Sequence, residues 1–184
     1  MGTFSGRRKA VSSSRSSRRW KKLKRAWPSL ALSTFVVTLD QWSKTRIRKI
    51  IPLDGKIRIN AFLNLTDVEN RGAAFSFLNG HSEWPNLFFL GLASMVSTVI
   101  LFWILRLPKT QRRLSIALCL ILGGAVGNAL DRLRYGYVID FIQVHYGVWY
   151  YPAFNVADSA ITVGAILLFW HFLRPGTRKH RPAN

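Results

Sequence analysis

Three carboxylates in the second half of the chain occupy positions where an ionised group is costly. After Glu83 the only acidic residues are Asp131, Asp140 and Asp158, and each has apolar or aromatic neighbours. A carboxylate at the centre of a bilayer helix costs roughly 2.5–3.5 kcal/mol on insertion scales, so such residues usually have a partner or a function. Two carboxylates in one low-dielectric site share a proton and form an acid and a base. Such a pair can activate water and protonate an amide leaving group.

Asp140 and Asp158 are the two candidates for this pair. The basic residue nearest to Asp140 is Arg134, and no Lys or Arg lies within ten positions of Asp158. Asp131, by contrast, is followed directly by Arg132. We therefore expect Asp131 to be neutralised by that arginine and to support the site rather than to react.

Further polar residues follow helical spacing. Asp40 precedes Lys44 by four positions, which is the favourable order for a helical ion pair. Asn128 and Asn155 each precede an acid by three positions, so each shares a helix face with that acid. These residues are expected to line or support the carboxylate site.

Other kinds of catalytic centre have little support in the sequence. The single cysteine, Cys119, cannot form an internal disulfide, and no Cys/His cluster has metal-ligand spacing. His81 and His145 are expected at the membrane interface, and His171 near the end of a helix. No Ser-His-Asp pattern is evident, so we expect water to be activated by carboxylates, without a metal or another cofactor.

Composition places these residues in a membrane protein. The 184-residue chain has a formal charge of +19, yet 49% of it is hydrophobic, which disfavours a disordered basic tail. The charge is segregated into residues 1–25 and 174–184 rather than interleaved with a modest core, which disfavours a soluble nucleic-acid binder. About 20 apolar residues span a bilayer core as a helix. Four segments approach that length: Ala26–Trp42, Pro85–Leu107, Leu114–Leu130 and Pro152–Leu173.

Positive charge sets the expected orientation. Four spans place residues 1–25, 106–113 and 174–181 on one side, which the positive-inside rule makes cytoplasmic. Residues 43–84 and 131–151 then lie outside. The predicted domains are a basic cytoplasmic tail (1–25), a membrane domain (26–173) and a second basic cytoplasmic tail (174–184). In this orientation four acids converge near the outer face: Asp40, Asp131, Asp140 and Asp158.

The outer segments carry a strand signal. Residues 57–66 alternate with the strand period, 70–72 form a plausible turn, and 73–77 continue beyond it. A sheet with open edges cannot cross lipid, so we expect it at the outer surface. The aromatic residues of 138–151 suit the membrane interface.

Five short elements occur in order over about residues 40–160: DQWSK at 40–44, ENRGAAF at 69–75, GGAVGNALDR at 123–132, VIDF at 138–141 and FNVADS at 154–159. Together they resemble the motifs of bacterial lipoprotein signal peptidases (signal peptidase II). The resemblance implies a membrane all-α fold with a small β element: four transmembrane helices plus an extracytoplasmic β-cradle at about 56–78. It implies an aspartic endopeptidase of the inner membrane.

Family members cut the signal peptide from a prolipoprotein, just before a cysteine that carries diacylglycerol. The resemblance assigns catalysis to Asp140 and Asp158, which agrees with the charge argument. The positions that match the lining or support of that site are Asp40, Lys44, Asn70, Gly72, Asn128, Asp131, Arg132, Asn155 and Ala157. It also implies sensitivity to the cyclic peptide globomycin. Membrane lipids are expected partners, nucleic acid is not, and we expect a monomer.

Two rival hypotheses remain at this stage. A proton or ion conductor would use the intramembrane aspartates as a relay, although the cytoplasmic half of each predicted span is nearly free of acids. A membrane-anchored nucleic-acid or lipid binder would act through residues 1–25. Proton flux in liposomes would test the first hypothesis, and deletion of the tail would test the second.

Overall fold

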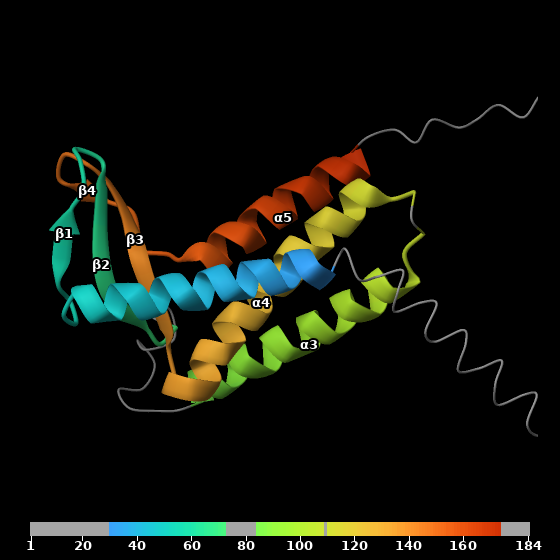
Figure 1. Cartoon of the computed structure of the whole chain (residues 1–184), viewed down its shortest axis with the longest axis horizontal. Coiled ribbons are helices and arrows are strands. Elements are labelled where there is room, and N and C mark those ends of the chain that lie inside the picture. Colours follow the sequence, from blue (N-terminus) through green and yellow to red (C-terminus); the bar gives the residue numbers. More distant parts are fainter. Residues whose placement is uncertain (1–29, 73–83, 109, 174–184) are drawn as a thin grey trace, which may run out of the picture.

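The computed structural model describes residues 30–72, 84–108 and 110–173. The described elements are a helix over residues 30–50, strands β1 (Lys56–Arg58) and β2 (Leu63–Asn70), helices α3 (Trp84–Arg106) and α4 (Arg112–Tyr135), strands β3 (Val138–Tyr146) and β4 (Trp149–Tyr150), and helix α5 (Val156–Leu173). The helices form a bundle, and the sheet lies at one end of it (Figure 1). The predicted fold class, all-α with a small β element, is confirmed, and the β element is a small antiparallel sheet.

Within the part of the chain that the structure describes, three helices are long and apolar enough to cross a membrane: α3, α4 and α5. They correspond to the second, third and fourth predicted spans. The first predicted span, 26–42, falls partly outside the described residues, and its described part belongs to a helix that continues to residue 50. A fourth span therefore stays a prediction.

Helix α4 is the centre of the bundle, and small residues let its neighbours approach closely. A Cβ added to Gly124 would overlap the Ala157 carbonyl oxygen of α5. A Cβ added to Gly127 would lie 2.9 Å from Oδ2 of Asp40, on the helix over residues 30–50. Small residues of this kind let helix backbones pack closely in a membrane, where the hydrophobic effect does not drive helix association. They bring polar groups of three helices together beside α4.

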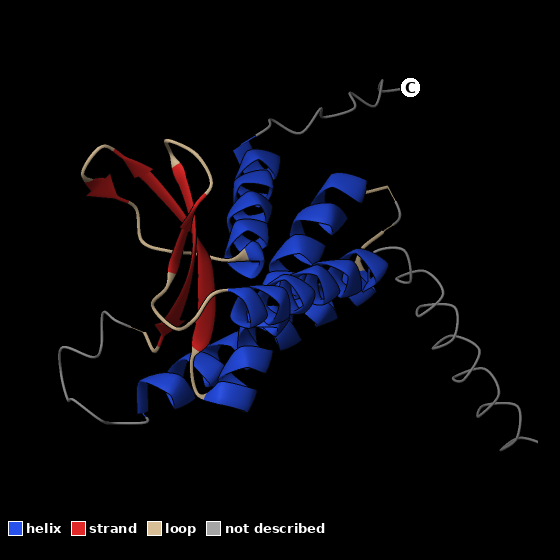
Figure 2. Cartoon of the chain, turned by 60° about the vertical axis from the view of Figure 1, so that its left-hand side comes forward, coloured by secondary structure: helices blue, strands red, loops and turns tan. Residues whose placement is uncertain are grey.

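The described residues form a four-stranded antiparallel sheet in the order β1-β2-β3-β4. Its strands are drawn in red in Figure 2. The prediction of one strand over 57–66 was wrong, because the alternating segment folds back on itself. β1 pairs with β2 through Ile57 opposite Leu65. Alternation has the same period on both sides of a turn, so the pattern alone does not reveal the reversal. The predicted continuation over 73–77 lies outside the described residues.

Strands β3 and β4 fall in the segment that we expected to be an aromatic interfacial connection. β3 supplies the long central pairing with β2, in which Val68 lies opposite Asp140 and Asn70 opposite Val138. Helix α4 ends at a left-handed cap, Gly136 (φ 80°), whose N–H donates to the Arg132 carbonyl oxygen. That cap turns the chain directly into β3. Strand β3 thus places Asp140 near the C-terminal end of α4 and the N-terminal end of α5.

Candidate active site

The two predicted catalytic carboxylates come from different kinds of element. Asp140 lies on β3 and is 2% exposed, and Asp158 lies in the first turn of α5 and is half-buried. Asn155 connects them, because its Nδ2 donates to Asp140 Oδ1 at 2.7 Å and its backbone N–H donates to Asp158 Oδ2 at 3.3 Å. One buried asparagine thus holds an oxygen of each acid.

The remaining carboxylate oxygens have asparagine donors of their own. Asn70 Nδ2 donates to Asp140 Oδ2 at 2.9 Å, and Asn128 Nδ2 donates to Asp158 Oδ1 at 2.7 Å. Gly72 fixes the first of these amides, since its N–H donates to Asn70 Oδ1 at 2.9 Å and its φ of 87° suits glycine. Neutral amides hold the carboxylates in place without cancelling their charge.

The start of α5 explains the orientation of Asp158. Asn155 Oδ1 accepts from the Asp158 N–H at 2.8 Å, while the Asp158 carboxylate accepts from the Asn155 N–H. This reciprocal pair is a capping box, with asparagine as the cap and aspartate at the third helical position. The first turn of a helix favours negative charge, because its N–H groups and dipole point toward it. Asp158 is therefore placed where an ionised carboxylate is stabilised.

A buried ion cluster adjoins the residues that hold the carboxylate pair. Lys44 Nζ lies 2.8 Å from Asp40 Oδ2 and 2.8 Å from Asp131 Oδ2, and it also donates to Asn128 Oδ1 at 3.2 Å. Asp40 in turn accepts the Ala157 N–H at 2.9 Å, which ties the helix over residues 30–50 to the start of α5. The predicted Asp40–Lys44 pair is present, and it extends to Asp131.

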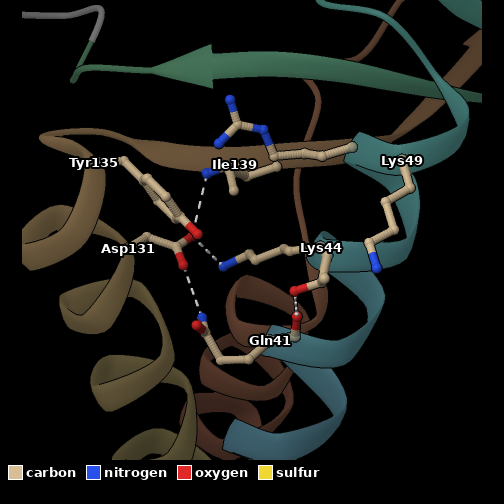
Figure 3. Close-up of a pocket in the computed structure, with 8 residues that line it drawn as sticks. Gln41, Lys44, Lys49, Asp131, Tyr135 and Ile139 are labelled. Atoms are coloured by element: carbon tan, nitrogen blue, oxygen red, sulfur yellow. Dashed lines mark hydrogen bonds and ion pairs between the residues drawn. The ribbon is translucent and has the colours of Figure 1, made fainter.

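The expected pairing of Asp131 with Arg132 was wrong. Successive residues on a helix do not face each other. Asp131 faces Lys44, the Ile139 N–H at 3.2 Å and Gln41 Nε2 at 2.7 Å (Figure 3). Arg132 lies over the ring of Phe89 on α3, 5.0 Å from its centroid, and interacts electrostatically with Asp158, Asp140 and Asp131.

Burial controls the protonation of Asp140. Desolvation raises the pKa of Asp140 to about 6; the Asn70 hydrogen bond opposes this rise, and the charge of Asp158 adds to it. A carboxylic acid with a pKa near 6 holds a proton that it can donate in weakly acidic to neutral solution. The site therefore combines Asp140, which keeps its proton to a higher pH than an ordinary aspartate, with Asp158, whose side chain accepts a backbone N–H at the start of α5.

The structure connects ten of the eleven sequence-predicted site residues by direct contacts, and Arg132 interacts with the site through its charge. Asp140, Asp158, Asn70, Asn128 and Asn155 form the front of the site, and Lys44, Asp40 and Asp131 its back. Ala157, fully buried, packs against α4, and Gly72 orients Asn70. Gln41 was missed, although a polar side chain inside an apolar helix, directly after Asp40, was a usable signal. Within the described ranges no His, Cys, Asp or Glu cluster could hold a metal.

Comparison with known proteins identifies the class of enzyme. The family model of signal peptidase (SPase) II matches residues 32–174. Lipoprotein signal peptidase of Acinetobacter baumannii is 46% identical over 157 residues, covering 84% of this chain and 87% of that protein. Lipoprotein signal peptidase of Coxiella burnetii is 45% identical over 153 residues, covering 83% and 94%.

Solved structures agree with these sequence relatives. A bacterial membrane enzyme determined by the in meso method at 1.9 Å resolution matches with a TM-score of 0.71 and 30% identity, over 80% of this chain and 93% of that one. A second such enzyme, at 2.3 Å resolution, matches with a TM-score of 0.71 and 29% identity over 85% of this chain and 94% of that one. The chain thus belongs to the signal peptidase II family of aspartic-type endopeptidases.

Proposed function

We propose that this protein removes the signal peptide from diacylglyceryl-modified prolipoproteins, with Asp140 and Asp158 as the catalytic pair. The proposal rests mainly on the two hydrogen bonds of Asn155, which donates to both carboxylates from one buried position. The names of the relatives, each a lipoprotein signal peptidase, support the substrate class. The cut falls just before the lipidated cysteine.

The environments of the two acids support a division of roles between them in this proposal. Asp140 is the acid, because burial favours its protonated form, and Asp158 is the base, because the start of α5 favours its charge. Asp158 takes a proton from water as the water oxygen attacks the scissile carbonyl carbon. Asp140 then gives its proton to the amide nitrogen as the carbon–nitrogen bond breaks. The ion pair of Lys44 with Asp40 and Asp131 stays intact and holds the three helices in register.

The membrane setting follows from the polarity of the chain. In this proposal the enzyme is a monomer of the bacterial inner membrane, with four spans, both termini in the cytoplasm and the site near the outer face. The apolar part of the substrate lies among the helices while its acyl chains remain in lipid. A globomycin-type cyclic peptide would compete for the same site.

The test is release of the leader from a diacylglyceryl precursor by the purified protein. Asp140→Asn and Asp158→Asn should each lower kcat by at least about 1,000-fold, since each removes a proton-transfer group that the other cannot replace. Asp54→Asn is the matched control, because Asp54 is an exposed carboxylate with φ 58°, a conformation that asparagine also tolerates. Near-normal cleavage by both site variants would disprove the assignment.

A further inference from the structure

The two faces of β2 point to different neighbours. Val68 lies opposite Asp140 in the β2–β3 ladder, and Asn70, two residues on, donates to Asp140 from the same face. Glu69 alternates to the other face. Any group that holds Glu69 therefore also fixes the strand end that carries Asn70.

Arg48, near the end of the helix over residues 30–50, is such a group. Its Nη2 donates to the Tyr137 hydroxyl at 3.0 Å and lies 4.0 Å from Glu69 Oε1. Its Nε lies 3.7 Å from Asp67 Oδ2. Its guanidinium carbon is 5.2 Å from the ring centroid of Tyr135 and 5.7 Å from that of Tyr137. One side chain, 32% exposed, thus touches a helix, a strand and the connection that leads into β3.

The remaining members close this arrangement. Arg71 Nη2 lies 3.0 Å from Glu69 Oε2, and the Arg71 guanidinium carbon lies 5.3 Å from the centroid of Tyr137. Burial raises the pKa of Glu69, but the Tyr137 hydroxyl and the two arginines outweigh it, so the net shift is downward. Glu69 is thus held as an anion between two cations. We call Arg48, Tyr135, Tyr137, Asp67, Glu69 and Arg71 the Arg48 cluster.

We infer that Arg48 is a positioning residue for the peptidase reaction: through Tyr137 and Glu69 it holds the end of β2 so that the Asn70 amide stays on Asp140. The cluster has two independent links to the acid. Tyr137 precedes Asp140 by three residues on one chain segment, and Glu69 precedes Asn70 on the other. A displacement of either segment changes the 2.9 Å contact between Asn70 Nδ2 and Asp140 Oδ2.

This inference rests on the proposed function, because it gives Asn70 a role only if Asp140 reacts. The charged groups that face Asp140 are Asp158 on α5, Lys44 on the helix over residues 30–50 and Arg132 on α4. None of them belongs to the Arg48 cluster. An effect of Arg48 on the acid must therefore pass through the contact between Asn70 and Asp140, rather than through direct contact of Arg48 with the acid.

Two variants test the inference by leader release from a diacylglyceryl precursor. Arg48→Gln removes the charge, and Tyr137→Phe removes only the hydroxyl while the pair of Arg48 with Asp67 remains. The second variant is needed because loss of Arg48 leaves the buried Asp67 carboxylate without its cation. Each should lower kcat about tenfold with KM unchanged, as expected for a small misplacement of a reacting group.

The fall of activity at high pH gives a second readout. The Asn70 hydrogen bond lowers the pKa of Asp140, so loosening that bond should move this fall in activity to higher pH. Arg46→Gln is the matched control, because Arg46 is an exposed arginine on the same helix that lies over Trp42 instead. It should leave kcat and the pH profile unchanged.

A double-mutant cycle with Asn70→Ala tests whether Arg48 acts through Asn70. If Arg48 acts through Asn70, Arg48→Gln should change kcat less than about twofold once Asn70 is already alanine. A full additional loss in that background, or unchanged kcat in both single variants, would overturn the inference and leave the proposed function standing. Full activity of Asn70→Ala itself would instead count against the proposed site.

Discussion

At the scale of single residues, the proton on Asp140 makes the enzyme's pH dependence predictable. Burial raises the pKa of Asp140 to about 6, so the acid keeps its proton below that pH and loses it as the pH rises through it. If Asp140 is the general acid, kcat/KM should fall above about pH 6, by about tenfold per pH unit, because this ratio reports the free enzyme.

The measurement is kcat/KM from pH 5 to 9 in one fixed lipid or detergent mixture. Asn70→Ala should shift the fall to higher pH, because it removes a donor that favours the ionised form of Asp140. A profile that is flat between pH 5 and 8 would show that Asp140 does not supply the proton.

Lys44 gives a prediction about stability. Lys44, Asp40 and Asp131 are each at most 1% exposed, and the lysine Nζ is 2.8 Å from an oxygen of each acid. Removal of one member of a buried ion cluster leaves uncompensated charge, which typically costs about 3–5 kcal/mol. Lys44→Met should therefore lower the thermal unfolding midpoint strongly, whereas Lys49→Met, an exposed lysine on the same helix, should not. Equal midpoints for the two variants would contradict this account.

Much of the candidate site could be predicted from residue type and spacing. Isolated acids in apolar surroundings indicated Asp140 and Asp158, and the i,i+4 spacing indicated the pair of Asp40 with Lys44. The partner of Asp131 could not be predicted in this way, because adjacent positions on a helix diverge and the true partner is Lys44, on another helix. Contacts between elements depend on how helices pack, and local spacing carries no information about that.

At the scale of elements, the sheet shows the same limit. Residues 57–66 have a clear strand period, yet the position of the turn between β1 and β2 leaves the period unchanged. The aromatic residues of 138–151 predict an interfacial connection, whereas residues Val138–Tyr146 of that segment form strand β3. Its pairing with β2 joins residues about 70 positions apart, such as Val68 and Asp140. Helices α3, α4 and α5, by contrast, were predictable, because length and apolarity alone define a span.

The close packing of α4 on α5 leads to a prediction about these two helices. A Cβ at Gly124 would overlap the Ala157 carbonyl oxygen, so Gly124→Ala must push α5 away from α4. Because Asn128 of α4 donates to Asp158 of α5, the shift should impair catalysis as well as stability. We expect a loss of kcat of about tenfold or more and a lower unfolding midpoint.

The matched control for this change is Gly91→Ala on α3. A Cβ at Gly91 meets no atom within 4 Å, and alanine is the better helix former by about 1 kcal/mol. Gly91→Ala should keep full activity and an unchanged or slightly higher midpoint. If Gly124→Ala behaves in the same way, the close contact between α4 and α5 does not position the site.

At the scale of the whole molecule, the basic tail separates the peptidase from the rival binding hypothesis. Residues 1–25 carry much of the positive charge, and residues 1–29 lie outside the described residues. Every residue of the proposed site lies between Asp40 and Asp158. Deletion of residues 1–25 should therefore keep cleavage of a lipidated precursor within about threefold of the full chain, measured at equal amounts of inserted protein. Loss of cleavage at equal insertion would assign a functional role to the tail.

The orientation of the protein in the membrane can be tested by cysteine labelling, because the sequence contains a single cysteine. Cys119 is the single cysteine and is fully buried, so a cysteine introduced elsewhere is the accessible one. Val148, 97% exposed in the turn between β3 and β4, should lie outside the membrane, and Gln111, exposed between α3 and α4, should lie in the cytoplasm. An impermeant maleimide should then label Val148→Cys in intact spheroplasts, but label Gln111→Cys only after permeabilisation. The reverse pattern would place the carboxylate pair on the cytoplasmic side and would contradict the orientation predicted from the positive-inside rule.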